Sequence, residues 1–137
     1  MWWIYALLSS LFAALTAIMA KIGIKDVNTD LATAIRTSVI LFITWSIVLF
    51  RGGVSTMTSL TKHNLLFLCF SGIATGLSWI FYFKALQAGN VSQVAPVEKL
   101  SVAIAIILAV VFLGEPLTFK TAAGAGLIIA GVVVLIS

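Results

Sequence analysis

Long apolar stretches alternate with short polar connections along the whole chain. Each of five stretches reaches the length of about 18 or more apolar residues that a membrane-spanning helix needs. They cover residues 2–20, 31–50, 64–88, 93–113 and 119–136. Barrel strands are shorter and alternate with polar residues, and a helix satisfies its own backbone within lipid. The pattern predicts an all-α polytopic membrane helix bundle of about five transmembrane helices, with residues 1–137 as one domain.

The polar connections indicate where these helices begin and end. Ser92 follows a Gly-Asn turn and is a predicted N-cap of the fourth helix. Gly114 and Pro116 lie in a Gly-Glu-Pro sequence that ends it. The connection 51–63 is rich in Ser and Thr, and we expect it to include a short interfacial turn.

Composition agrees with lipid as the main solvent. The chain is 62% hydrophobic and 9% charged, with a mean hydropathy of +1.22, whereas soluble domains carry about 25% charged residues. The net charge of +4 comes from basic residues scattered among the connections, which is typical of contact with a lipid bilayer and not of a nucleic-acid partner. His63 has no second ligand nearby. We therefore expect no metal, no cofactor and, without a nucleophile–base pattern, no enzyme.

The basic residues are nearly balanced between the two sides of the membrane. With five spans, Arg51, Lys62 and Lys120 lie on the same side of the membrane as the N-terminus. The other side holds Lys21, Lys25 and Lys84, with Arg36 and Lys99 just inside their helices. Because orientation follows a clear excess of Lys and Arg, this balance favours insertion in both orientations. The alternative is a fixed insertion with the N-terminus outside.

Charged side chains inside the apolar stretches are the first candidates for chemistry, because each costs about 2.5–3.5 kcal/mol there and usually faces a cavity or a partner. Glu98 and Lys99 lie roughly 9–10 Å deep in the fourth stretch at 1.5 Å per residue. As helix neighbours they point about 100° apart, so we expect each to need a partner elsewhere, such as Arg36 for Glu98. Pro96 removes a backbone hydrogen bond and predicts a helix kink beside a cation or proton site.

Each of these charges also has a purely structural interpretation. Glu98 lies in the first turns of its helix, where the helix dipole favours an acid and water reaches the interface. Arg36 and Lys84 are long enough to extend outward to the headgroups.

The third stretch carries an aromatic cluster of Trp79, Phe81, Tyr82 and Phe83. Aromatic faces bind organic cations, so Trp79 and Tyr82 join the three charged residues as candidates for substrate or proton binding. Packing or lipid contact is the alternative.

Small residues recur at four-residue spacing in two stretches. Gly72 and Gly76 form one such pair, and Ala122, Gly126 and Ala130 form a longer row. They let helix backbones approach one another, since packing drives helix association in lipid. They predict helix packing, either within the chain or between two copies.

Three segments resemble the EamA domain of the drug/metabolite transporter superfamily. They are residues 84–101, the turn Phe112-Leu-Gly-Glu-Pro-Leu-Thr with the Gly-rich stretch after it, and Ala-Ile-Arg36-Thr at the start of the second stretch. Members typically carry two such domains in inverted orientation. The resemblance implies a half-transporter that pairs with a second copy, antiparallel, and a cargo chamber lined by the middle of the fourth span, at Glu98 and Lys99.

The last three stretches are also similar to the small multidrug resistance proteins. Those carry a membrane-embedded glutamate in their first helix, but the matching stretch here is Ala13-Ala14-Leu15, without a carboxylate. The resemblance therefore gives no support to proton-coupled export of drug cations by that route. It leaves Glu98 as the deeply placed candidate for coupling.

These observations favour a secondary transporter or exporter of small metabolites or drug-like solutes. We expect it to work as a homodimer in the bacterial cytoplasmic (inner) membrane. Two alternatives remain open: a membrane accessory subunit that does not transport, and a flippase for a lipid carrier.

Overall fold

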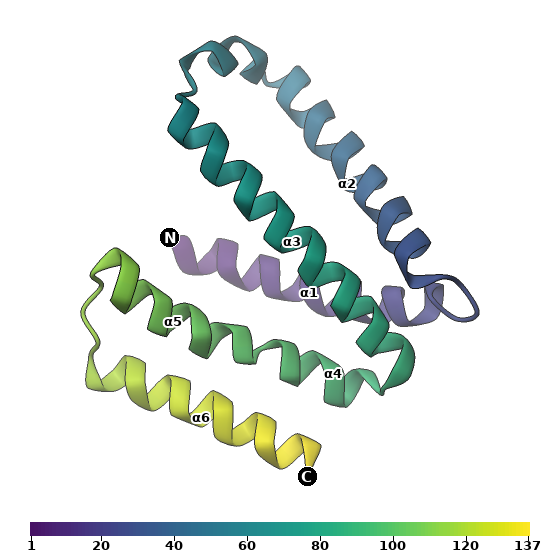
Figure 1. The fold of residues 1–137 in the computed structure, drawn as a ribbon, viewed down its shortest axis with the longest axis vertical. Helices are drawn as coiled ribbons and strands as arrows, with labels where there is room; N and C mark the ends of the chain where they lie inside the picture. The colour runs from purple at the N-terminus through teal and green to yellow at the C-terminus, as the bar shows by residue number, and fades with distance from the viewer. The chain divides into compact units, whose positions relative to one another are not determined.

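A computed structural model describes all residues from Met1 to Ser137 and contains helices without strands (Figure 1). The elements are α1 Trp2–Gly23, α2 Thr29–Phe50, the 3-10 helix η1 Gly53–Ser59, α3 Lys62–Ala88, α4 Val91–Glu98, α5 Leu100–Leu113 and α6 Phe119–Ile136. Five segments are long and apolar enough to cross a membrane, and α4 with α5 forms one of them. The predicted all-α polytopic fold is confirmed, and η1 is the short turn expected within 51–63.

Local signals explain most helix ends. Asn28 caps α2, because its side-chain oxygen accepts hydrogen bonds from the backbone N–H groups of Asp30 and Leu31. Gly114 ends α5 with a φ of 66°, a left-handed conformation that glycine adopts without steric cost. The prediction of Ser92 as an N-cap is wrong. The helix begins at Val91, two residues before the predicted Gln93, with Asn90 at the N-cap position, so Ser92 lies inside its first turn.

The chain divides into two compact units, and each is described by itself. One unit contains residues 1–18 and 88–137. In it, α6 packs along both α4 and α5 (Figure 1), and Ala103 of α5 and Val132 of α6 are buried. The turn at Gly114 reverses the chain and brings α6 back along the preceding helices.

The other unit contains residues 19–87, with α2, η1 and α3. At the end of α3, the side-chain amide of Gln87 donates hydrogen bonds to the carbonyls of Ile24, at 3.0 Å, and Val27, at 2.9 Å. The ammonium group of Lys21 donates to the carbonyl of Leu86, which is fully buried. These contacts hold the end of α3 against the connection between α1 and α2.

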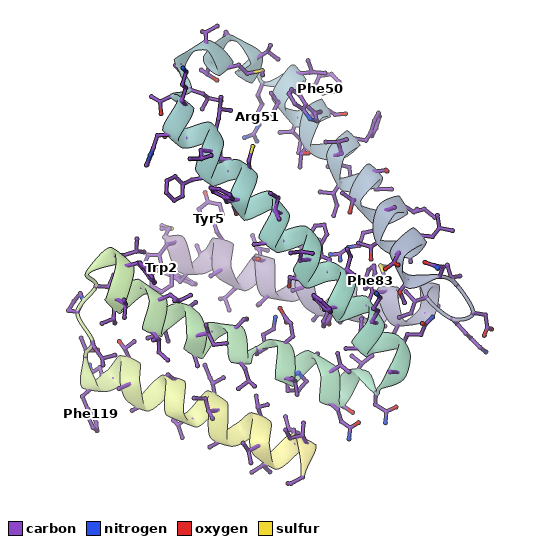
Figure 2. All side chains as sticks on the ribbon, in the orientation of Figure 1. Trp2, Tyr5, Phe50, Arg51, Phe83 and Phe119 are labelled. Carbon is purple, nitrogen blue, oxygen red and sulfur yellow. The ribbon has the colours of Figure 1, made fainter.

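Large apolar side chains cover the outside of the helices. Most Leu, Ile and Phe residues are exposed, and no candidate span is more than 6% buried within the chain. Figure 2 shows Trp2, Tyr5, Phe50 and Phe119 near helix ends, where aromatic rings favour the headgroup level. Such a surface suits lipid, and the chain is an integral membrane protein.

Candidate functional site

Arg36 of α2 lies against the aromatic side chains of α3. Its guanidinium carbon Cζ is 4.3 Å from the centroid of the Trp79 ring and 5.3 Å from that of Phe83. Trp79 and Phe83 are four residues apart and therefore share one face of α3. Phe83 is buried, and Figure 2 shows it between α3 and α2. The contacts are cation–π interactions, which strengthen as water is removed.

Of the other two aromatic residues, Tyr82 lies toward Arg36 and Phe81 faces outward. Tyr82 is half-buried and interacts electrostatically with Arg36. Phe81 is 68% exposed and belongs to the apolar surface. Three of the four aromatic residues therefore lie around Arg36, and the fourth faces outward.

An ion pair lies closer to the helix ends than Arg36 does. The ammonium nitrogen of Lys84 is 3.6 Å from a carboxylate oxygen of Asp30, and both side chains are more than half exposed. Such an exposed pair contributes about 0–1 kcal/mol. Lys84 has a partner on α2, and the pair marks the polar end of the unit.

The fourth span is interrupted, which corrects the prediction of one helix over 93–113. It consists of α4 and α5, with Lys99 between them. The backbone N–H of Lys99 bonds the carbonyl of Pro96 at 3.0 Å, and that of Val102 bonds the carbonyl of Lys99 at 3.0 Å. These bonds span three residues and tighten the helix locally. Pro96 has no N–H to donate to the carbonyl of Ser92, so α4 lacks that backbone hydrogen bond. The kink predicted at Pro96 stays a prediction.

Glu98 and Lys99 form an ion pair at this break. The ammonium nitrogen of Lys99 is 2.6 Å from a carboxylate oxygen of Glu98. The expectation that these neighbours cannot neutralise each other is therefore wrong. That expectation assumes an uninterrupted helix. It also neglects the length of the lysine side chain, which lets the ammonium group reach back to the carboxylate of Glu98. The predicted pairing of Glu98 with Arg36 would join the two units and stays a prediction.

The glycines of the predicted small-residue rows have open space beside them within their own units. A Cβ atom added at Gly72, Gly76 or Gly126 would meet nothing within 4 Å. Ala122 and Ala130 are exposed like Gly126, and α6 buries its other face. Packing within the chain and packing between two copies both stay predictions.

An apolar hollow of about 380 Å³ lies between α2, η1 and the start of α3. Its walls are formed by Thr44, Trp45, Val48, Gly53, Met57, Leu60 and Leu65. No charged side chain lines it. The hollow is suited to apolar groups, and its polar side chains are limited to Thr44 and Trp45.

The predicted site residues come together in two separate groups. Arg36, Trp79 and Tyr82 belong to one unit, and Pro96, Glu98 and Lys99 to the other. Whether these residues bind a solute or a proton stays a prediction. Sequence reasoning missed the parts played by Asp30 and Gln87, whose partners lie more than fifty residues away in the chain. The polar character of Gln87 near a helix end was the available signal.

Comparisons with known proteins agree with this membrane architecture. A family model described as "EamA-like transporter family" matches residues 1–137. A protein from Sinorhizobium sp, named "Uncharacterized transporter in cobO 3'region", is 45% identical over 134 residues, which cover 98% of this chain and 95% of that protein. No solved structure matches the chain significantly.

Proposed function

The chain belongs to the EamA-like transporter family, and on that premise we propose that it is a secondary transporter of small organic metabolites in a bacterial inner membrane. The family and the relative's name indicate a membrane transporter and not an enzyme. A secondary transporter needs polar groups near the middle of its apolar segments, where cargo is held while access alternates between the two sides.

One observation carries this proposal: the placement of Arg36 over Trp79 and Phe83 within a candidate span. Arg36 lies about 10 Å along α2 from the first residue of that helix, at 1.5 Å per residue. A cation at such a depth is costly, and membrane proteins retain one mainly where it serves cargo, ions or a partner.

The interrupted fourth span adds support. Transporters commonly place ion and substrate sites where a membrane helix is broken, since the break releases backbone groups and bends the helix around the cargo. Here the break carries Glu98 and Lys99 as an ion pair. We infer that Glu98 exchanges a proton or cation during the transport cycle.

We infer further that the transporter is a homodimer of antiparallel copies. The nearly balanced basic residues support insertion in both orientations. The exposed row of Ala122, Gly126 and Ala130 supports close contact between helices of two copies. Two inverted copies would place equivalent sites around a common axis, which is an arrangement suited to alternating access.

The test is flux of a mixed solute library across liposomes that contain the purified protein. The library should include amines, neutral amides, amino acids, carboxylates and phosphate esters, and empty liposomes serve as the control. Uptake or exchange of at least one solute class is expected. Absence of flux for the whole library would reject the proposal and favour the accessory role, while movement of labelled lipid alone would favour the flippase.

A further inference from the structure

We propose that the site at Arg36 binds the carboxylate or phosphate oxygens of a small organic anion, so that anions are the solutes this transporter carries. The claim about transport rests on the proposed function. The claim about binding rests on the contacts of Arg36 and can be tested without transport.

Arg36 has no acidic partner within its own unit. The chain has four acidic residues. In the unit that holds Arg36, Asp30 is paired with Lys84 and Asp26 lies in the connection before α2. In the other unit, Glu98 is paired with Lys99, and Glu115 lies in the turn between α5 and α6. Within its own unit, Arg36 forms no ion pair with Asp26 or Asp30, although a charge within a span favours a counter-charge.

The N–H donors of the Arg36 guanidinium point away from the aromatic rings on which it stacks. Stacking on Trp79 and Phe83 uses the flat face of the guanidinium. The N–H groups lie in the plane of the guanidinium, so stacking on the ring faces does not use them as donors. A planar fork of such donors matches the two oxygens of a carboxylate or phosphate. The aromatic rings restrict the motion of the side chain, which lowers the entropy lost on binding.

The site favours anions over cations because Arg36 already covers the aromatic face. An aromatic face attracts organic cations, but the face of Trp79 is already covered by the protein's own cation. A cationic solute would have to displace Arg36 and approach its charge at close range, which is unfavourable in a medium of low dielectric constant. The cluster therefore works as an anion site.

The surrounding charges act in the same direction. Within residues 19–40 and 79–88, the basic side chains are Lys21, Lys25, Arg36 and Lys84, and the acidic ones are Asp26 and Asp30. The net positive charge of this end raises the local concentration of anions. A solute that enters from this end meets the Lys84–Asp30 pair before it reaches Arg36.

The experiment compares solutes that share one carbon skeleton and differ in charge. The probes are butyrate, benzoate and glycerol phosphate as anions; butyramide, benzamide and glycerol as neutral counterparts; and butylammonium and benzylammonium as cations. Each is measured in two ways: as a shift in the thermal unfolding of the protein in detergent, and as flux into liposomes that contain it. The variants are Arg36→Gln, Arg36→Lys and, as a matched control, Arg51→Gln at the end of α2.

We expect at least one anion to stabilise the protein and to cross the membrane, with weaker effects from its neutral and cationic counterparts. Arg36→Gln should weaken anion binding by about tenfold or more, as expected for loss of a charged hydrogen-bond pair. Arg36→Lys keeps the positive charge but lacks the planar set of donors. Its affinity for anions should lie between that of the unchanged protein and that of Arg36→Gln. Arg51→Gln should behave like the unchanged protein. If Arg36→Gln does not fold, the test compares anion binding by Arg36→Lys and Arg51→Gln. Weaker binding by Arg36→Lys than by Arg51→Gln supports the site.

Several outcomes would overturn the inference. They are preferential binding of cations, equal binding of anions by the Arg36 variants and the control, and binding of no anion in the panel. Anions that stabilise the protein through Arg36 but do not cross the membrane would uphold the binding site and reject the transport function. A response through Arg36 to phosphatidylglycerol vesicles alone, without a response to soluble anions, would identify a lipid headgroup and reject a solute site.

Discussion

The ammonium nitrogen of Lys99 lies 2.6 Å from a carboxylate oxygen of Glu98, where α4 ends and α5 begins. Each charge therefore has its counter-charge within the same span, which lowers the cost of keeping both there. Removing one partner leaves the other without compensation. The pair is thus tied to two properties at once, namely the stability of the interrupted span and the proton exchange that we propose for Glu98.

Glu98→Gln should abolish the pH dependence of solute flux, because the amide keeps the size of the side chain but cannot take up or release a proton. The loss of the ion pair should also destabilise the protein by about 1 kcal/mol, since both side chains are partly exposed. Flux measured over a range of pH tests the first expectation, and thermal unfolding in detergent tests the second.

The double variant Glu98→Gln with Lys99→Gln is the control for that experiment. It removes both charges and should recover most of the lost stability without recovering the pH dependence. A single variant that keeps the pH profile of the unchanged protein would remove Glu98 from the transport mechanism.

Pro96→Ala should make the fourth span more regular. Alanine supplies the N–H that proline lacks and can donate it to the carbonyl of Ser92, so α4 should gain a backbone hydrogen bond. We expect a gain in stability of about 1–3 kcal/mol together with slower flux if the break bends around cargo. Thermal unfolding and initial flux rates measure the two effects. Unchanged flux in the stabilised variant would show that the break plays no part in transport.

Gln87→Ala should destabilise the unit of residues 19–87 more than Asp30→Asn does. Gln87 makes two hydrogen bonds to the backbone carbonyls of Ile24 and Val27, and their loss should cost about 1–2 kcal/mol. Asp30→Asn removes an exposed ion pair worth at most about 1 kcal/mol. Hydrogen exchange in detergent, followed at the end of α3, should show faster exchange in the Gln87 variant. The reverse order would contradict this assignment of the contacts.

The spans were predictable from the sequence because they depend on local features. The bounds of α6 agree with the predicted 119–136, since Thr118 accepts a hydrogen bond from the backbone of Thr121 and fixes the start. The break at Lys99 was not predicted, because hydropathy records which residues are apolar and not how their backbone groups bond. The contact of Arg36 with Trp79 depends on how α2 and α3 align, and contacts such as those of Gln87 set this alignment between residues far apart in the chain.

Gly126→Leu should weaken dimerisation without changing the fold of a single copy. A Cβ atom at Gly126 would meet nothing within 4 Å, so there is room for the start of a larger side chain within its own unit. If the row of Ala122, Gly126 and Ala130 lies between two copies, leucine there holds the backbones apart and should weaken association by about tenfold or more.

Gly124→Leu is a matched control for this variant. Gly124 is equally open but lies about 200° around the helix from Gly126, at 100° per residue. Crosslinking and sedimentation in detergent measure the dimer fraction, and circular dichroism measures the helix content of both variants. Loss of the dimer in the Gly126 variant alone identifies the row as the contact face. Equal dimerisation of both variants and the unchanged protein would place the interface elsewhere, because a row that touches a second copy has no room for an added isobutyl group.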